Sequence, residues 1–497
     1  MNCSCIKKLL ISIAKRKNRF LRPEDEICCS KSDKQNIYLG DGVITKMKTN
    51  PITFNMRKFT ALGLLAGMLS IPALAQNKIE FKEFTLDNGL HVIMHQDNTT
   101  PIVVTSVLYH VGSKNENPER TGFAHFFEHL MFEGSENIER GQYGNIIQAR
   151  GGTLNAYTSN DITYYYELLP SNELELALYM ESERMLHSKV DQIGVDTQRE
   201  VVKEERRQQY ENQPYGTILL ETLKRAYVAH PYQWAPIGSM DHLNAASIEE
   251  FQQFYKDFYV PNNATLSIAG DLDYAQTEKW VRSYFSEIPK GQKAIYRPNI
   301  IEPKKTAETR DIIYDNIQIP AVIQAYNLPK RNHPDSYALS MLSTYLTGGN
   351  SSLMTKELVD KQQKALAVAA IPLELEDGGV FIMYGITNMG VEAKDLETEI
   401  DKLIKQVQDT GISDDDFAKL QNIMENNIVS GNSTVAGIAE NLAEAHVVYG
   451  NTNYINQVMD SYSKVTKADI QRVAKEYLDL TGRVVLYYLP KSAQPAE

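Results

Sequence analysis

Two histidines and a glutamate interrupt an apolar run at residues 122–134, "GFAHFFEHLMFEG". If the run is helical, His125 and His129 are four residues apart and lie on the same face. Two imidazoles so placed can hold one metal ion, and Glu128 can act as a base on a water molecule beside it. The pattern therefore predicts a hydrolytic zinc site that needs a third protein ligand. The alternative is a pair of histidines with a purely structural place in the core.

The third ligand is expected in an acid-rich stretch with helical periodicity, "TQREVVKEERRQQY" at residues 197–210. Three of its glutamates are candidates: Glu200, Glu204 and Glu205. On a helical wheel, Glu205 falls between Val201 and Val202, whereas the other two glutamates fall outside this apolar stripe. A buried carboxylate without a partner is costly, and a bound cation would supply that partner. Glu205 is therefore the predicted third ligand.

Gln198 lies on the same stripe of this stretch, and we predict that it supports the ligands from outside the ligand set. The inward position of Glu205 also has a second explanation, which is a buried salt bridge to Arg206 or Arg150. The histidine pair favours the metal site, because a salt bridge alone gives no reason for the two imidazoles.

The elements around these residues repeat along the chain at an offset of 219 residues. "SIEEFQQFYKDFYV" at 247–260 aligns without a gap with "TKADIQRVAKEYLD" at 466–479, and each begins with a capping residue followed by an acid three positions later. At the same offset, "TLSIAG" at 265–270 and "VVLYYL" at 484–489 are both typical of strands. Chance similarity is the alternative, but the constant offset favours a duplication.

The duplication predicts two copies of one α/β unit. We place the first unit at residues 79–295, a linker at 296–305 and the second unit at 306–492. The second unit has no copy of the metal motif, because the offset leads from the three motif positions to Thr344, Thr347 and Gly348. We therefore expect one zinc ion per chain, bound by the first unit.

"HFFEH", together with "REVVKEE" about 70 residues later, resembles the pitrilysin-type (M16, inverse zincin) metallopeptidases, whose signature is an inverted His-x-x-Glu-His motif. The chain resembles in particular the bacterial processing-peptidase-like members, in which one half binds zinc and the other half is degenerate. The resemblance covers residues 79–492. It implies an α+β fold in which two homologous units, each an antiparallel-rich sheet packed with helices, form half of a clam-shell chamber. It also implies a dimer, either with a second copy or with a related subunit.

Carried over to this chain, the resemblance gives four residues the central roles, with zinc ligands His125, His129 and Glu205 and the base Glu128. Asn155 and Ala156 match the family's edge strand, to which a peptide substrate can add as a further strand. The same stretch can also be an ordinary hairpin of the core sheet, and both readings can hold together. The chain departs from the family at Gln198, where many members have an acid seven residues before the third ligand.

A secretory signal is predicted within the sequence. "MRKFTALGLLAGMLSIPALAQ" at 56–76 has a basic head, an apolar stretch and small residues before a cleavage point. The apolar stretch, residues 59–71, is too short to span a bilayer. We therefore expect a signal peptide at 56–75 that starts at Met56, an upstream extension at 1–55 absent from the mature protein, and a periplasmic location without a stable membrane span. The alternative is an amphipathic core helix after a disordered tail.

Charge and cysteine content restrict the chemistry further. Residues 76–497 carry 38 basic and 58 acidic side chains, a balance that repels phosphate backbones and argues against nucleic-acid binding. All four cysteines lie within the first 29 residues, so the rest of the chain has no thiol chemistry and no cysteine metal ligands. We expect a zinc endopeptidase that acts on peptides or unfolded segments. Two alternatives are a non-catalytic scaffold subunit and a peptidase subunit that is active only with a related partner chain.

Overall fold

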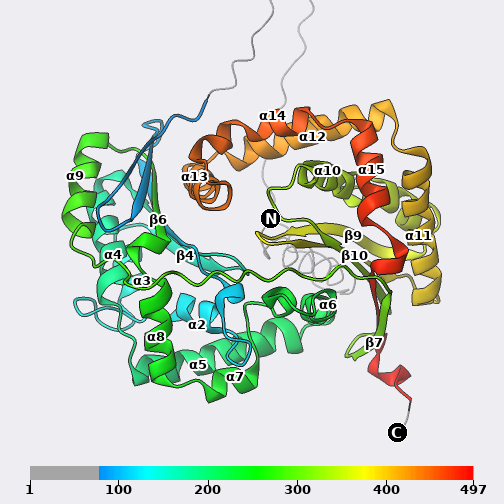
Figure 1. Cartoon of the computed structure of the whole chain (residues 1–497), viewed down its shortest axis with the longest axis horizontal. Helices are drawn as coiled ribbons and strands as arrows, with labels where there is room; N and C mark the ends of the chain where they lie inside the picture. The colour runs from blue at the N-terminus through cyan, green and yellow to red at the C-terminus, as the bar shows by residue number, and fades with distance from the viewer. Residues whose placement is uncertain (1–77, 496–497) are drawn as a thin grey trace, which may run out of the picture. The chain divides into compact units, whose positions relative to one another are not determined.

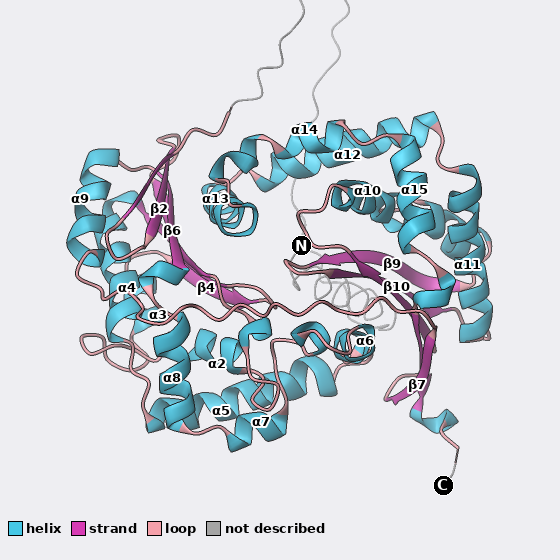
Figure 2. Cartoon of the chain, in the orientation of Figure 1, coloured by secondary structure: helices cyan, strands magenta, loops and turns pink. Residues whose placement is uncertain are grey.

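The computed structural model describes residues 78–495, which form two sheets packed with helices (Figure 1, Figure 2). The extension predicted at 1–55 and the signal peptide predicted at 56–75 lie outside the described residues. Among the described helices, none is both long and apolar enough to cross a bilayer. The mixed α/β architecture with two homologous halves confirms the predicted fold class.

The first sheet has six strands in the order β1-β2-β6-β3-β5-β4. Neighbouring strands pair antiparallel except for β2 and β6, which run parallel. β6, the last of these strands along the chain, lies between β2 and β3. The strands are β1 Lys82–Thr85, β2 His91–Gln96, β3 Ile102–Tyr109, β4 Thr153–Thr158, β5 Thr163–Pro170 and β6 Ala264–Gly270.

The second sheet repeats this plan in the order β7-β11-β8-β10-β9. Among its described strands, β7 and β11 alone run parallel, and β11 lies between β7 and β8. β8 spans the residues of β3 displaced by 219 positions, so the predicted duplication is confirmed. The strands are β7 Thr309–Asp315, β8 Ala321–Leu328, β9 Ala365–Glu374, β10 Gly379–Thr387 and β11 Val484–Pro490.

The helices follow the same division. The first half holds α2 Phe123–Leu130, α3 Tyr143–Ala149, α4 Leu174–His187, α5 Gln192–Arg206, α6 Ile218–Ala226, α7 Met240–Ala245, α8 Ile248–Phe258 and α9 Tyr274–Phe285. The second half holds α10 Asp335–Thr347, α11 Ala393–Thr410, α12 Asp414–Gly431, α13 Val435–Tyr449, α14 Val458–Ser463 and α15 Lys467–Tyr477. No described residue between α9 and β7 forms a helix or strand. The linker predicted at 296–305 lies in this connection, and the limits of the two units stay predictions.

The repeated helices α8 and α15 begin in the same way. Ser247 and Glu250 form a capping box at the start of α8, and Thr466 and Asp469 form one at the start of α15. In each, the hydroxyl and the acid satisfy backbone N–H groups that have no partner inside the helix.

β3 is buried on both faces because helices cover the first sheet on both sides. Val103 and Val107 pack in the core that contains α2, α4 and α8. Val104 packs on the opposite side with Ile438 and Leu442 of α13, because successive side chains of a strand point to opposite faces. A helix from the second half of the sequence therefore covers the first sheet (Figure 1).

A buried ion cluster connects the two halves at Lys114. This side chain is 1% exposed as a residue, and its Nζ lies 3.0 Å from Asp161, 2.6 Å from Glu376 and 2.9 Å from Asp377. Burial lowers the pKa of Lys114, but the carboxylates outweigh burial and raise it above its usual value. Glu376 and Asp377 lie between β9 and β10, so the cluster joins the first half to the second.

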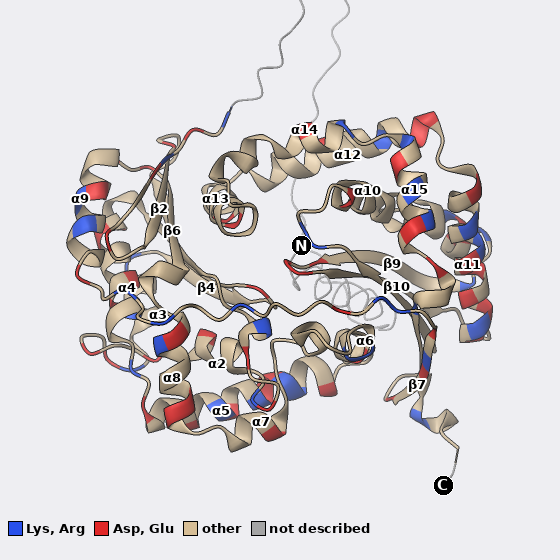
Figure 3. Ribbon diagram, viewed as in Figure 1, with Lys and Arg blue, Asp and Glu red and all other residues tan. Residues whose placement is uncertain are grey.

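Acidic and basic residues both occur along the outer helices (Figure 3). On α5, Lys203 pairs with Glu200 at 2.8 Å, and on α11, Lys402 pairs with Glu399 at 2.9 Å. Such pairs, three residues apart, lie on the same face of their helix. These two helices therefore present mixed charge to solvent rather than a continuous basic face.

Candidate metal centre

The first turn of α2, the helix with both histidines, is held by Glu116. Its two oxygens accept the backbone N–H groups of Gly122 and Ala124, each at 2.9 Å, which have no partners within the helix. Burial raises the pKa of the Glu116 carboxyl to about 8. Gly122 has a φ of 97°, and a Cβ at this position would lie 3.1 Å from the Cα of Gly238, so a larger residue would be strained. These contacts define where α2 begins.

The apolar side of α2 packs into the core and leaves its polar side toward α5. Phe123, Phe126 and Phe127 are at most 3% exposed, and their rings contact Phe251 and Phe254 of α8. The three polar residues of the motif are only partly buried. The apolar residues of the run therefore seat the helix, and the polar residues form a group of their own.

The structure brings the two histidines and Glu205 together between α2 and α5. His125 Nε2 lies 3.5 Å from Glu205 Oε2, and His129 Nε2 lies 3.3 Å from the same oxygen. One possible ligand atom from each residue lies within 4.8 Å of the others. The imidazole planes are inclined by 79°, so their lone pairs can reach one point from different directions. Two imidazole nitrogens and a carboxylate oxygen are a zinc ligand set that leaves one position open, and these residues fit it.

The electrostatic surroundings of this group favour positive charge. The side chains of His125, His129 and Glu205 are 12%, 22% and 24% exposed, so the group is accessible from solvent. Burial lowers the pKa of His129, but Glu205 and Glu128 outweigh burial, and the pKa is raised. Carboxylates that favour a proton on His129 also favour a metal cation in its place.

α5 presents Glu205 at the rim of its inward face. Val202 is fully buried, whereas Val201 is 43% exposed, so the prediction that both valines face the core is wrong for Val201. The buried stripe runs instead through Val195 and Val202, which are about two turns apart. The other two candidate glutamates point to solvent, with side chains 66% and 51% exposed: Glu200 and Glu204.

Gln198 lies beside the ligand group, in contact with His129. Its hydrogen bond to His129 is one of the interactions that raise the pKa of that histidine. Its Nε2 also donates to Glu133 Oε1 at 2.5 Å, and Glu133 in turn accepts from Arg140. Gln198 thus connects His129 to a buried carboxylate, although its role toward a metal ion stays a prediction.

Glu128 lies between the histidines and the edge of the first sheet. Thr158, the last residue of β4, donates its hydroxyl to Glu128 Oε2 at 2.7 Å. Thr158 was not predicted as a site residue, although it stands two positions after Ala156 in the predicted substrate strand. The bond orients the carboxylate that the sequence assigns as the base.

β4 is one of the two edge strands of the first sheet, and the resemblance implied an edge strand here. It pairs with β5, where Asn155 lies opposite Tyr166 and Ala156 opposite Tyr165. Among the described residues, no strand pairs with the other edge of β4. Asn155 is exposed and Ala156 is half-buried. The substrate-binding role of these two residues stays a prediction.

A second group of possible ligands, Glu83, His91 and His446, was not predicted. Its two imidazoles stack with centroids 3.6 Å apart and planes inclined by 4°, so their lone pairs run in parallel planes and do not converge. Both ring nitrogens of His91 have hydrogen-bond partners within the protein: Nε2 lies 3.2 Å from Glu83 and Nδ1 lies 3.1 Å from Thr85. Burial lowers the pKa of His446 to about 4, so this ring is neutral in the stack at pH 7. In both groups of the described part of the chain the possible ligand atoms lie within 4.8 Å of one another, but only the first has imidazole planes that are steeply inclined to each other.

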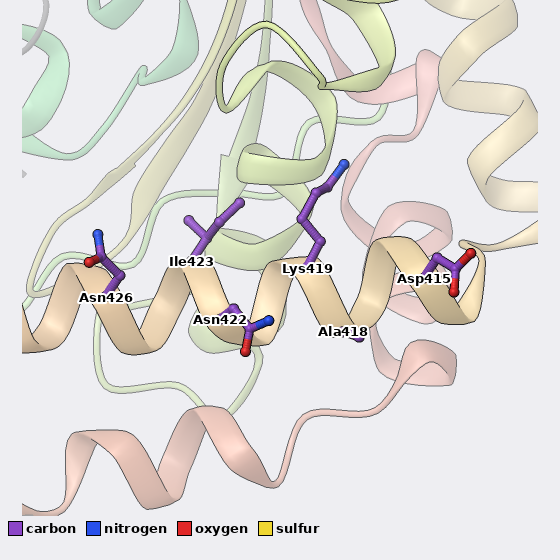
Figure 4. A pocket seen from close by; sticks show the side chains of 6 residues that line it. All are labelled: Asp415, Ala418, Lys419, Asn422, Ile423 and Asn426. Carbon is purple, nitrogen blue, oxygen red and sulfur yellow. The ribbon is translucent and has the colours of Figure 1, made fainter. Parts of the chain in front are cut away.

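A pocket along α12 shares no residue with the metal group (Figure 4). Its lining consists of six residues of that helix: Asp415, Ala418, Lys419, Asn422, Ile423 and Asn426. One carboxylate next to one amine does not make a metal ligand set. The candidate for the zinc site predicted from the sequence is therefore the group between α2 and α5, and not this pocket.

Two family profiles match this chain. The profile described as insulinase (peptidase family M16) matches residues 91–234, and the profile described as peptidase M16 inactive domain matches residues 245–424. Zinc protease PqqE from Helicobacter pylori is 31% identical over 412 residues, which are 82% of this chain and 92% of that protein. A probable mitochondrial-processing peptidase subunit beta from Arabidopsis thaliana is 23% identical over 412 residues, which are 80% of this chain and 76% of that protein.

Solved structures have the same fold. A protease from Helicobacter pylori matches with a TM-score of 0.79 at 29% identity, over 83% of this chain and 100% of that chain. A peptidase M16 inactive domain from Pseudomonas fluorescens matches with a TM-score of 0.74 at 17% identity, over 84% of this chain and 99% of that chain. From the two profiles and the relative at 31% identity, it follows that this chain belongs to peptidase family M16.

Proposed function

We propose that this chain is a zinc-dependent endopeptidase that cleaves peptides or unfolded polypeptide segments. The observation that carries the proposal is the convergence of His125, His129 and Glu205, with Glu128 next to the second histidine on the same helix. Relatives that are named zinc proteases support it, including one at 31% identity.

The residues of the group suggest how the reaction proceeds. A zinc ion held by the three ligands would polarise the scissile carbonyl and lower the pKa of a water molecule at its open position. Glu128 takes the proton from the attacking water and returns it to the leaving amine. Thr158 holds Glu128 Oε2 through its hydroxyl, which limits the orientations of the base.

The exposed edge of β4 supports an extended peptide as substrate. A peptide that pairs with this edge gains backbone hydrogen bonds that do not depend on its sequence, and Asn155 and Ala156 lie along that strand. Because Thr158 ends β4 and contacts Glu128, a peptide along the strand passes beside the base. Segments that are unfolded, and therefore able to extend, are the substrates that this arrangement selects.

We also propose that the chain works as a dimer, with a second copy or with a related subunit. The periplasmic protease PqqL from Escherichia coli shares the fold with a TM-score of 0.68 at 19% identity, and the match covers 82% of this chain but 47% of that one. A structural relative thus has, in one chain, roughly twice the length of the segment that it shares with this protein. A second subunit would supply the missing half.

One preparation of the mature protein tests metal, activity and assembly together. We expect about one zinc ion per chain, as one three-ligand site implies. Removing the ion with a chelator should abolish cleavage of an unfolded protein or a peptide library, and added zinc should restore it. Light scattering should give the mass of two chains.

The alternatives predict other outcomes. A protein that binds zinc but cleaves only after a related subunit is added is a peptidase subunit that needs its partner. A protein that binds zinc and cleaves nothing in either state is a scaffold. Purified protein that takes up no zinc contradicts the metal site, and full activity as a single chain contradicts the dimer.

We propose a periplasmic location for the mature chain. The support is the three-part signal pattern at 56–75, which begins at Met56. Sequencing the N-terminus of the mature protein should give Gln76 as the first residue. A mature chain that starts far upstream of Gln76 contradicts the signal peptide.

A further inference from the structure

α5 ends at Arg206, one residue after Glu205, and continues into a π-helical turn, η3 (Arg207–Glu211). In this turn, Asn212 N–H donates to the carbonyl of Arg207 at 2.7 Å, five residues back. π-helical turns are rare, and they occur frequently at functional sites. One residue of the turn, Gln209, reaches back toward the ligand group, because its Nε2 donates to Glu205 Oε1 at 2.5 Å.

We propose that Gln209 is a positioning residue that presents Glu205 to the metal ion, a role that rests on the proposed zinc site. The two oxygens of Glu205 have different neighbours. Oε1 accepts from Gln209, whereas Oε2 lies 3.5 Å from His125 Nε2 and 3.3 Å from His129 Nε2. By holding Oε1, Gln209 restricts rotation of the carboxylate and keeps Oε2 toward the histidines. Hydrogen bonds of this kind orient ligand carboxylates in metal sites.

A neutral amide suits this position better than a charged donor would. An arginine or lysine on Glu205 would pair with its charge and repel a metal cation. Gln198, eleven residues before Gln209 and therefore on nearly the same side of the helix, gives His129 an amide partner as well. Two glutamines thus support the ligand group without adding charge to it.

The near end of the turn is anchored to the start of α2. Arg206 Nε lies 3.1 Å from Glu211, and Arg206 Nη1 donates to the carbonyl of Gly238. Gly238 in turn packs against Gly122, the residue before α2. These contacts hold the end of α5, which carries Glu205, against the start of α2, which carries the histidines.

The far end of the turn is anchored as well. Tyr215 has a φ of 61°, which is unfavourable for a bulky residue, so contacts must hold it there. Its N–H donates to Asp315 at 2.9 Å, and its hydroxyl donates to the carbonyl of Ile319 at 2.5 Å. Since Asp315 ends β7, the segment after the π-helical turn is attached to the second half of the chain.

The chain contains its own control for Gln209. Gln208 Nε2 donates to Glu204 Oε1 at 2.9 Å, which is the same pair of residue types at the same spacing. Glu204 points to solvent, however, with a side chain 51% exposed, and takes no part in the ligand group. A difference between the two glutamines therefore reports on the metal site and not on helix stability.

The test compares Gln209→Met with Gln208→Met, since methionine keeps the length of the side chain and removes the amide. Zinc affinity is measured for the full mature chain by competition with a chelator of known affinity, and thermal unfolding is measured on the zinc-free proteins. We expect Gln209→Met to weaken zinc binding by about 10–100-fold, as loss of a supporting hydrogen bond does. Gln208→Met should bind zinc as the wild type does, and the unfolding midpoints of the two zinc-free variants should agree.

Equal zinc affinity of Gln209→Met and wild type overturns the role of Gln209 and leaves the zinc site intact. Equal losses of zinc affinity in Gln209→Met and Gln208→Met also overturn the role of Gln209, because such losses would come from a change in the helix that both residues share. If the wild type binds no zinc, the proposed function and the role of Gln209 fall together. A Gln209→Asn variant gives a second measure: its shorter amide should not reach Oε1, and it should resemble Gln209→Met.

Discussion

Replacing Glu128 by glutamine is expected to lower kcat for peptide cleavage by about 10²–10⁴-fold or more, while the protein keeps its zinc. Glutamine has nearly the same shape and can still accept the Thr158 hydroxyl through its carbonyl oxygen, so the helix and the ligands should stay in place. It cannot take a proton from water. Peptide cleavage kinetics and metal analysis on the same preparation check both parts of the expectation.

Glu128→Gln needs a matched control, a variant with the same chemical change outside the site. Glu204→Gln makes the same chemical change at an exposed glutamate of α5 and should keep wild-type kcat. If Glu128→Gln cleaves at the wild-type rate, another group is the base and the proposed mechanism is wrong. If it loses its zinc, Glu128 contributes to metal binding and not only to proton transfer.

Replacing Glu205 by glutamine is expected to weaken zinc binding by more than about 100-fold, which exceeds the loss usual for residues that only support a ligand. The carboxylate supplies negative charge to the ion, and an amide does not. Chelator competition measures the affinity, and cleavage activity should fall in parallel because the ion supplies the reactive water.

Two glutamates of the same helix are matched controls for Glu205. Glu200 and Glu204 point to solvent, and their change to glutamine should leave zinc affinity within about twofold of wild type. If Glu200→Gln or Glu204→Gln loses zinc while Glu205→Gln retains it, the helical-wheel assignment of the third ligand is wrong.

The metal motif and the duplication could be predicted because each depends on spacing within a short segment. His125 and His129 are one turn apart in any α-helix, whatever the rest of the fold. The structure places Glu205 beside the two histidines, between α2 and α5, although one of the two valines used to define the inward face is exposed. The helical wheel leads to this residue because Glu205 lies at the rim of the buried stripe through Val195 and Val202, and its role as a ligand stays a prediction.

Apart from Gln198, the residues that support the group could not be predicted from spacing. Glu116 caps α2 from a loop, and Thr158 reaches Glu128 from a strand 30 residues away. A helical wheel assumes a regular α-helix, so it does not predict the π-helical turn that follows α5. The packing of α13 on the first sheet depends on contacts between distant parts of the chain, and the periodicity of a short segment does not predict such contacts.

The order of the strands has a consequence for synthesis of the protein. β6 lies between β2 and β3, and β11 lies between β7 and β8. In each sheet, the strand that is synthesised last therefore pairs with strands that are synthesised much earlier. During synthesis from the N-terminus, β2 and β3 cannot pair with β6, the strand between them, until residue 270 has been added. Pairings this distant are slow to form and expose apolar edges in the meantime. The helix with the two histidines is complete about 140 residues before the sheet beneath it is, so a nascent chain presents its histidines before it has a folded unit.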